Sequence, residues 1–202
     1  MDVHNCIENR RDTRHFTNEC VPESVIKTAL NAAHNAPSVG LTEPWRFIIV
    51  TTQQKKIEIK KLFDIESAIA QSKISNEKQK SLYQSLKLEA IMEAPIGIAV
   101  FCDTSILDSF TLGTIGNNNT LEWNCACAIQ NMWLSLTAQS FGAGWVSIIN
   151  YDSFCNVFET PKSWKALGYM CIGKPATDYG GEPMLQKEKW ATKSKDPFVK
   201  YI

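Results

Sequence analysis

The segment from Leu121 to Phe141 is the feature of this sequence that most constrains its fold. It is rich in Ala, Cys, Met, Leu and Trp, has few charges after Glu122, and is followed by Gly142 and Gly144. This composition predicts a helix that is apolar on nearly all sides, and such a helix has to be covered on all sides. In a chain of 202 residues, we therefore expect either the central helix of one domain or a helix shared between two subunits.

Short apolar and β-branched segments predict the strands of a sheet around this helix. The predicted strands are residues 46–50, 95–102, 145–149 and 166–172. Segments with helical spacing of apolar residues alternate with them. The predicted helices are residues 2–9, one that opens at 21–24 and ends by 35 or 36, and residues 53–72, 76–92, 121–141 and 152–158. We expect a single three-layer domain of α/β or α+β type over residues 1–202.

The segments between these elements are interpreted from their glycines, prolines and charges. Two prolines and a glycine predict a fixed loop over residues 36–45. The glycines and consecutive asparagines of residues 105–119 predict a second loop. Four lysines in the 53–72 helix, at positions 55, 56, 60 and 61, are expected to form its solvated face.

Charge and cysteine content exclude several classes of protein. The formal net charge is zero, which argues against a nucleic-acid-binding domain. No apolar run is long enough to span a membrane, and the first residues lack the apolar stretch of a signal peptide. We therefore expect a cytoplasmic protein. Seven irregularly spaced cysteines predict buried, reduced thiols and no disulfide framework, and three scattered histidines predict no metal site.

The five residues from Arg10 to Arg14, Arg-Arg-Asp-Thr-Arg, are the main candidate for chemistry. A guanidinium group offers a rigid fork of donors that suits a phosphate or a carboxylate. Nearby positive charge favours the ionised form of a carboxyl group, so Asp12 is expected to be ionised at neutral pH. Taken alone, however, the motif is better explained as an ordinary ion-pair cluster at a helix end.

Familiar catalytic motifs do not provide another explanation. The sequence contains no GxGxxG, GxxxxGK[ST], HExxH or GxSxG pattern. Ser147 follows a glycine-rich turn, but no histidine lies near it in sequence, so a serine hydrolase has little support. Ser147 alone could equally be a strand hydroxyl that is bonded to the backbone.

Five blocks of the sequence together resemble a known family. They are residues 10–14, APSVGLTEPWRF at 36–47, SLKLEAIMEAP at 85–95, CAIQNMW at 127–133 and GAGWVSI at 142–148. In this order they resemble the nitroreductase fold, and more narrowly its 5,6-dimethylbenzimidazole synthase branch. The resemblance runs from about residue 7 to residue 190. It implies an α+β fold with a mixed, mainly antiparallel sheet, and a homodimer with two FMN sites at the subunit interface.

The resemblance also implies flavin contacts from several parts of the chain. The three arginines match contacts to the phosphate and ribityl chain, and the 37–40 segment matches a loop that reaches the flavin from the partner subunit. The 87–88 segment lies near a further flavin contact, and the 144–147 segment lies near the flavin N5 edge. The family's C-terminal Gly-Trp-Arg block is replaced here by Lys189–Lys193, which implies a single-point contact. The expected FMN-binding residues are Arg10, Arg11, Asp12, Thr13, Arg14, Pro37, Ser38, Gly40, Lys87, Leu88, Gly144, Ser147 and Lys193.

The resemblance to the 5,6-dimethylbenzimidazole synthase branch depends mainly on Asp12 and Ser147. Typical nitroreductases have a neutral hydroxyl residue where this chain has Asp12, and in the synthase branch the matching Asp and Ser are needed for turnover. There reduced FMN is a substrate: it reacts with dioxygen and is fragmented to 5,6-dimethylbenzimidazole and erythrose 4-phosphate. The resemblance implies that Asp12 is a general base or proton shuttle and that Ser147 hydrogen-bonds N5 and holds dioxygen. A separate flavin reductase would supply the reduced FMN.

Two other functions fit the same fold. One is an FMN-retaining nitro- or flavin-reductase that uses NAD(P)H. The other is a non-catalytic FMN-binding or flavin-storage protein. Asp12 favours the synthase over the reductase, and the presence of both Asp12 and Ser147 disfavours the storage protein.

Overall fold

The structure is a computed structural model that describes residues 1–107, 111–117, 119–177 and 181–202. Parts of the predicted 105–119 loop and of the C-terminal segment lie outside the described residues. The elements are α1 Val3–Asn9, α2 Glu23–His34, the 3₁₀ turn η1 Val39–Leu41, β1 Trp45–Val50, α3 Gln53–Ser72, α4 Glu77–Ser85, β2 Ile96–Asp103, α5 Thr120–Ala138, β3 Gly142–Val146, α6 Tyr151–Val157, β4 Trp164–Gly173 and α7 Met184–Lys187.

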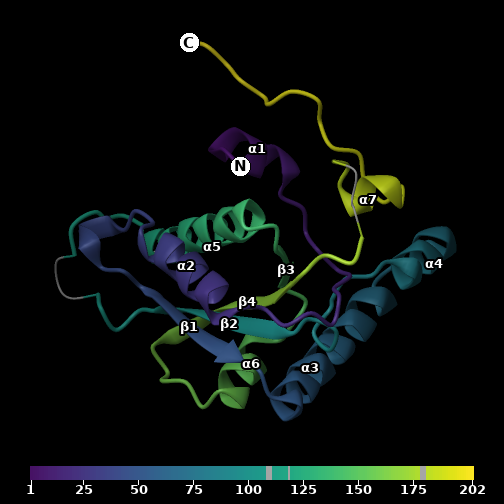
Figure 1. The fold of residues 1–202 in the computed structure, drawn as a ribbon, viewed down its shortest axis with the longest axis horizontal. Helices are drawn as coiled ribbons and strands as arrows, with labels where there is room; N and C mark the ends of the chain where they lie inside the picture. Colours follow the sequence, from purple (N-terminus) through teal and green to yellow (C-terminus); the bar gives the residue numbers. More distant parts are fainter. Residues whose placement is uncertain (108–110, 118, 178–180) are drawn as a thin grey trace.

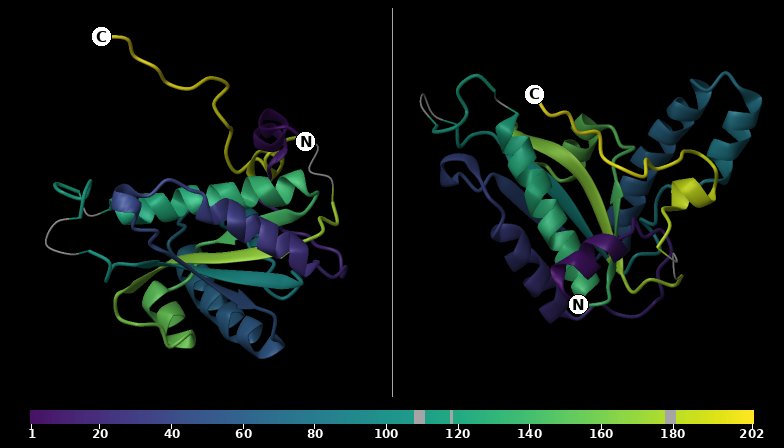
Figure 2. Two further views of the ribbon diagram at one scale, coloured as in Figure 1. Left: turned by 60° about the vertical axis from the view of Figure 1, so that its left-hand side comes forward. Right: turned by 90° about the horizontal axis from the view of Figure 1, so that it is seen from above.

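The four described strands form an antiparallel sheet in the order β1-β2-β4-β3. Helices α2 and α5 lie on one face of this sheet, and α3 and α6 lie on the other (Figures 1 and 2). Each face has its own cluster of buried apolar side chains, because the strands turn alternate side chains to opposite faces. The three-layer α+β prediction is therefore confirmed. The resemblance also implies a mixed sheet, but within the described residues the parallel pairing is an isolated bridge between Asp12 and Ala143.

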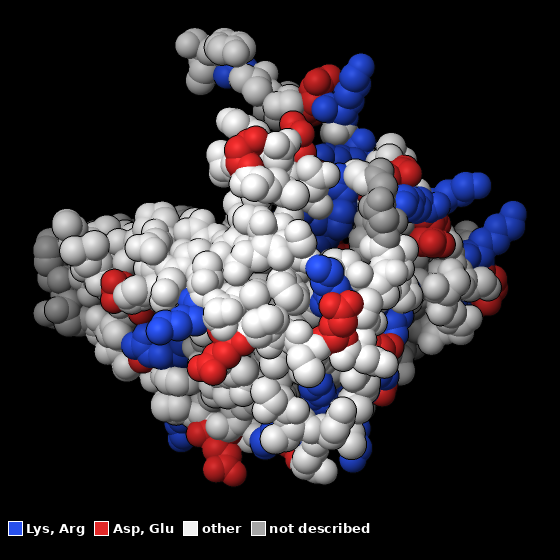
Figure 3. Space-filling view, viewed as in Figure 1, with Lys and Arg blue, Asp and Glu red and all other residues white. Residues whose placement is uncertain are grey.

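Helix α5 confirms the predicted long apolar helix, but this chain covers only part of its surface. Its buried residues are Leu121, Cys125, Ala128, Ile129, Met132, Trp133 and Leu136. On the other side Ala126, Cys127 and Gln130 are exposed, and Trp123 is 55% exposed. Figure 3 shows few charged side chains over the upper part of the α2 and α5 layer. A strip of weakly polar surface therefore lies open along α5.

The predicted helix over residues 76–92 is wrong beyond Ser85. Helix α4 ends there, and residues 86–95 form an irregular segment that is held by tertiary contacts. The Glu89 carboxylate accepts a hydrogen bond from the Ile91 backbone N–H at 2.6 Å. The side chains of Ala90 and Ile91 are fully buried. Burial of these side chains overrides the helical spacing of the sequence.

The prediction that Lys56 belongs to the solvated face of the 53–72 helix is also wrong. This side chain is buried rather than solvated. Its ammonium group donates hydrogen bonds to the backbone oxygens of Ala94, at 2.5 Å, and Pro95, at 3.1 Å. Lys56 thus fixes the end of the 86–95 segment immediately before β2.

Two further predictions differ from the structure. The strand expected at residues 145–149 begins earlier and ends earlier, at Gly142 and Val146, because its glycines pair with β4. All seven cysteines are free thiols, but Cys20 and Cys127 are exposed, so the prediction of burial is wrong for these two. Among the described residues, no helix is both long enough and apolar enough to cross a membrane.

Candidate functional site

The Arg10–Arg14 segment lies along the edge of the sheet beside β3. The Thr13 N–H donates a hydrogen bond to the Ala143 oxygen at 2.9 Å. Gly144 permits this close approach, because a Cβ atom there would lie 2.2 Å from the Thr13 backbone oxygen. In this extended segment neighbouring side chains point to opposite sides. Asp12 therefore faces one cavity, whereas Arg11 and Thr13 face another.

Asp12 is held by two groups from different parts of the chain. Its carboxylate accepts a hydrogen bond from Arg14 Nη2 at 2.5 Å and another from the Trp145 backbone N–H at 2.9 Å. Arg14 also donates to the Trp145 oxygen at 2.8 Å. Arg14 and the start of the GWVS segment thus fix the Asp12 side chain in one orientation.

Burial raises the pKa of Asp12 above its usual value. Arg14, the Trp145 N–H and Arg10 all act in the opposite direction, but together they do not outweigh the burial. The neighbouring positive charges do favour the ionised carboxylate, as the sequence predicts, but burial has the larger effect on the pKa. The side chain remains 40% exposed, so a carboxyl group with an increased affinity for protons is accessible from the cavity.

A cavity of about 380 Å³ brings the two predicted catalytic residues together. It is lined by Asp12, Trp133, Trp145 and Ser147. Ser147 follows β3 directly and is exposed, while the Trp145 indole N–H donates to the Leu167 oxygen at 2.9 Å. The cavity lining therefore includes a carboxylate, a hydroxyl group and two indole rings.

Arg10 lies at the C-terminal end of α1, next to this cavity. Its guanidinium carbon lies 4.6 Å from the centre of the Trp133 ring. Burial and the neighbouring Arg11 lower the pKa of Arg10, although Asp12 acts in the opposite direction. The sequence does not mark Trp133 as a site residue, because a tryptophan in an apolar helix is also typical of a hydrophobic core.

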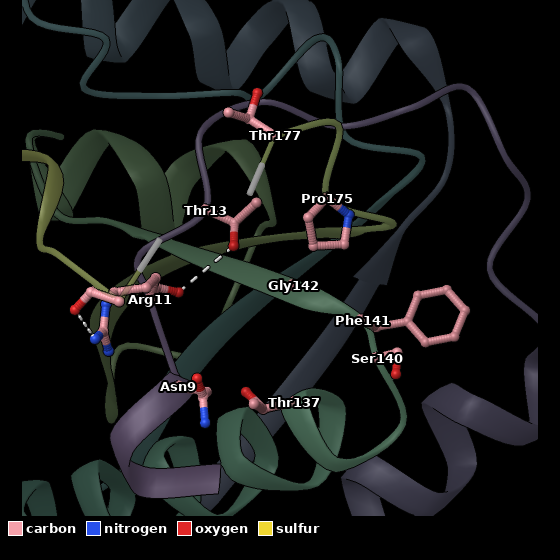
Figure 4. A pocket seen from close by; sticks show the side chains of 10 residues that line it. Asn9, Arg11, Thr13, Thr137, Ser140, Phe141, Gly142, Pro175 and Thr177 are labelled. Carbon is pink, nitrogen blue, oxygen red and sulfur yellow. Dashed lines mark hydrogen bonds between the residues drawn. The ribbon is translucent and has the colours of Figure 1, made fainter. Parts of the chain in front are cut away.

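Arg11 points away from Asp12 and binds backbone oxygens. It donates from Nη1 to the oxygens of Glu8, at 2.6 Å, and Arg10, at 2.7 Å, and from Nη2 to the Gly181 oxygen. Figure 4 shows it beside Thr13 in a second cavity, of about 240 Å³. Arg11 thus joins the N-terminal segment to the segment that contains α7. Figure 3 shows Lys and Arg side chains gathered where α1 and α7 meet the rest of the molecule.

Lys193 belongs to this C-terminal segment. Its backbone N–H donates to Gln186 Oε1 at 3.0 Å. With Gly181 it lines a shallow hollow of about 630 Å³, separate from the cavity that contains Asp12.

The predicted 37–40 flavin contacts lie near the opposite end of α5. The Val39 N–H donates to Asn124 Oδ1 at 3.1 Å, and a Cβ atom on Gly40 would lie 3.2 Å from the Leu112 oxygen. Trp133, at the Asp12 cavity, follows Asn124 by nine residues, or about 13 Å along the helix axis. Pro37, Ser38 and Gly40 are therefore not brought to Asp12 within one chain.

Lys87 and Leu88 line another hollow, of about 260 Å³, between α3 and α4. The Lys87 ammonium group is paired with the Glu93 carboxylate. Within one chain, the predicted flavin contacts thus fall into several groups, of which only the Arg10–Arg14 and Gly144–Ser147 groups meet.

Comparisons with known proteins show the family of this chain. The model of the nitroreductase family matches residues 7–174. The 5,6-dimethylbenzimidazole synthase of Rhodospirillum rubrum is 32% identical over 95% of this chain and 90% of its own length. A 5,6-dimethylbenzimidazole synthase of Rhodobacter capsulatus is 34% identical over 90% of this chain and 86% of its own length. A crystal structure of an iodotyrosine deiodinase bound to FMN and 3-iodo-L-tyrosine superposes with a TM-score of 0.78 at 17% identity, covering 100% of this chain and 99% of that one.

Proposed function

The chain belongs to the nitroreductase family, and we propose that it is a 5,6-dimethylbenzimidazole synthase that fragments reduced FMN with dioxygen. The products would be 5,6-dimethylbenzimidazole and erythrose 4-phosphate. One observation carries this proposal: Asp12 and Ser147, from distant parts of the sequence, line one cavity beside the Arg10 guanidinium. The synthases of two bacteria, at 32% and 34% identity, support the same reaction.

The residues of this cavity fit FMN. The ligand carries a phosphate, and the Arg10 guanidinium is a bidentate donor for a phosphate group. The indole ring of Trp145 in the cavity wall suits a flat aromatic ring system. When bound, reduced FMN supplies the electrons that reduce dioxygen, and its own ring is the source of the product.

The three arginines have different roles in this proposal. Arg10 binds the phosphate, and Arg14 orients Asp12 through their ion pair. Arg11 fixes the segment around Gly181 and so joins the N-terminal segment to the α7 region, which carries Lys193. Thr13 and Gly144 keep the Arg10–Arg14 segment against β3.

Asp12 accepts and returns protons in this proposal. Cleavage of carbon–carbon bonds requires protons to move, and a base is most effective when its pKa lies near the working pH. Burial raises the pKa of Asp12, and so brings it closer to neutral pH than the pKa of an ordinary aspartate. Ser147, exposed after the end of β3, would donate its hydroxyl hydrogen to the flavin N5 region and would hold dioxygen.

A second copy of the chain completes the site. The 37–40 segment lies near the far end of α5, and the α5 face that carries Trp123 is open. A homodimer that packs along this face buries the strip and brings Pro37, Ser38 and Gly40 of one subunit to the flavin of the other. A separate flavin reductase supplies reduced FMN to both sites.

One experiment tests the reaction directly. The pure protein is mixed with reduced FMN in air, and 5,6-dimethylbenzimidazole is measured by mass spectrometry against the loss of flavin. Formation of one benzimidazole per flavin lost is the expected result. Quantitative reoxidation to FMN without this product would instead indicate an FMN-retaining reductase, and oxidation of NAD(P)H without an added flavin reductase would strengthen that interpretation.

Two variants test the roles of the residues. Asp12→Asn and Ser147→Ala are each expected to lower product formation by about 100-fold, the usual scale for loss of a proton-transfer group. Asp64→Asn, an exposed carboxylate on α3, is the matched control and should keep the wild-type rate. If either site variant fragments reduced FMN at the normal rate, the assigned role of that residue is wrong.

A further inference from the structure

Trp133 supports the guanidinium of Arg10 with the face of its indole ring. We propose that Trp133 is a positioning residue which makes the site select phosphorylated flavin over riboflavin. It does so by holding Arg10 in place for the phosphate. This inference rests on the proposed function, because it takes the ligand to be FMN.

Both partners of this stack are attached to rigid parts of the molecule. Trp133 is only 7% exposed and belongs to the apolar core between α5, α2 and the sheet. Arg10 is the C-terminal cap of α1, where its N–H donates to the Cys6 oxygen at 2.9 Å. Cys6 is buried in turn. The Arg10 side chain thus extends from a fixed backbone position onto a fixed ring.

Arg10 differs from the other two arginines of the motif in what its donors bind. Arg11 donates to three backbone oxygens, and Arg14 donates to Asp12 and Trp145. Among the described residues, the Arg10 guanidinium lies over the Trp133 ring and donates no hydrogen bond to a protein acceptor. A cation–π contact uses no N–H group as a conventional hydrogen-bond donor, so the N–H groups of Arg10 remain for a phosphate.

The position of Trp133 connects this stack to the catalytic cavity. Trp133 lines the same cavity as Asp12, Trp145 and Ser147. Burial lowers the pKa of Arg10, which indicates that the cation has lost part of its hydration. A phosphate dianion would replace that hydration with charge-assisted hydrogen bonds. Riboflavin, which lacks a phosphate, gains nothing from the stack.

The test compares the dissociation constants of FMN and riboflavin by quenching of flavin fluorescence. Trp133→Leu is expected to weaken FMN binding by about fivefold, as loss of a cation–π contact implies, and riboflavin binding by less than about twofold. Trp133→Phe keeps a ring and should retain most of the preference for FMN. Phe158→Leu removes an aromatic ring under Lys55 on the other face of the sheet, and this control should not change the preference.

A double-mutant cycle shows whether Trp133 acts through Arg10. In an Arg10→Met background, Trp133→Leu should cause no further loss of FMN affinity relative to riboflavin. The inference would be overturned if Trp133→Leu weakened the binding of FMN and of riboflavin equally. It would also be overturned if Trp133→Leu lowered the preference for FMN as much in the Arg10→Met background as in the wild type. If the wild type itself binds both flavins equally, the phosphate clamp of the proposed function fails. If the wild type prefers FMN and Trp133→Leu keeps that preference, only the inference fails.

Discussion

At the scale of single residues, the Asp12 carboxyl group is more costly to the fold than its neighbours suggest. It has a short ion pair with Arg14 and a backbone hydrogen bond from Trp145, yet burial still raises its pKa. The folded protein therefore holds the Asp12 proton more tightly than the unfolded chain does. A group with this property lowers stability once it is ionised, and such groups are often kept for function.

The pH dependence of stability gives the first prediction. Between the ordinary and the raised pKa of Asp12, the folded state binds more protons than the unfolded state, so this group makes stability fall as pH rises. At neutral pH, Asp12→Asn should therefore unfold at the same temperature as the wild type or at a higher one, although its product formation is expected to be about 100-fold lower. Thermal unfolding from pH 3 to pH 8 checks this. A variant less stable than the wild type at pH 7 would contradict the predicted sign.

Gly144 gives the second prediction. A Cβ atom at this position would meet the Thr13 backbone oxygen at 2.2 Å, and the backbone cannot rotate away. Gly144→Ala should destabilise the fold by about 2 kcal/mol, as overpacking does, and weaken FMN binding. At Gly142 the nearest atom, at 2.5 Å, is the Thr13 hydroxyl oxygen. Because a side chain can adjust, Gly142→Ala should cost less. Denaturant unfolding compares the two, and an equal loss would contradict the distinction.

At the scale of elements, the 86–95 segment shows how a distant side chain determines local structure. Its sequence has helical spacing, but the chain leaves the helix after Ser85 and turns towards β2. Lys56 on α3 binds the oxygens of Ala94 and Pro95, and the apolar side chains of Ala90 and Ile91 are buried below the sheet. The segment contains Lys87 and Leu88, which the resemblance predicts to contact the flavin. Because Lys56 of α3 fixes one end of the segment, α3 helps to set the position of these two residues.

Replacement of Lys56 gives the third prediction. Lys56→Met would leave the oxygens of Ala94 and Pro95 without their donor, at a cost of roughly 2 kcal/mol. Urea unfolding should show this loss. Lys61→Met, an exposed lysine on the same helix, should unfold like the wild type. If both variants have the wild-type midpoint, Lys56 does not anchor the segment.

At the scale of the whole molecule, one chain leaves both its surface and its proposed site incomplete. The α5 face that carries Trp123 is open, and the 37–40 segment contacts the start of α5 rather than the Asp12 cavity. The C-terminal residues extend away from the body (Figure 1), with Phe198 and Tyr201 each 94% exposed. A second subunit can cover these apolar side chains and supply the distant loop.

The oligomeric state gives the fourth prediction. The wild type should be a dimer by light scattering after gel filtration, and Trp123→Asp should shift it towards the monomer, because an unpaired charge in an apolar interface is costly. The same variant should bind FMN less tightly. Ile65 on α3 is similarly exposed, at 57% against 55% for Trp123, and Ile65→Asp should stay dimeric. A wild-type monomer that binds FMN at full affinity would contradict the proposal.

The sequence by itself determined the elements whose signals are local. Apolar spacing and flanking prolines predict α2, and continuous apolar runs predict β2 and β4, because side-chain periodicity follows from backbone geometry alone. The motif blocks, through their resemblance to a family, also predicted Asp12 and Ser147. Both now line one cavity, and the family model matches residues 7–174.

Tertiary structure alone decided which neighbours each polar side chain has. Arg10, Arg11 and Arg14 are alike in sequence, but one stacks on Trp133, one binds backbone oxygens and one pairs with Asp12. Lys56 looks like a surface lysine and is buried. These differences arise from contacts between residues far apart in the chain. No local pattern encodes such contacts, because their free energy depends on burial and on partners that only the folded molecule brings together.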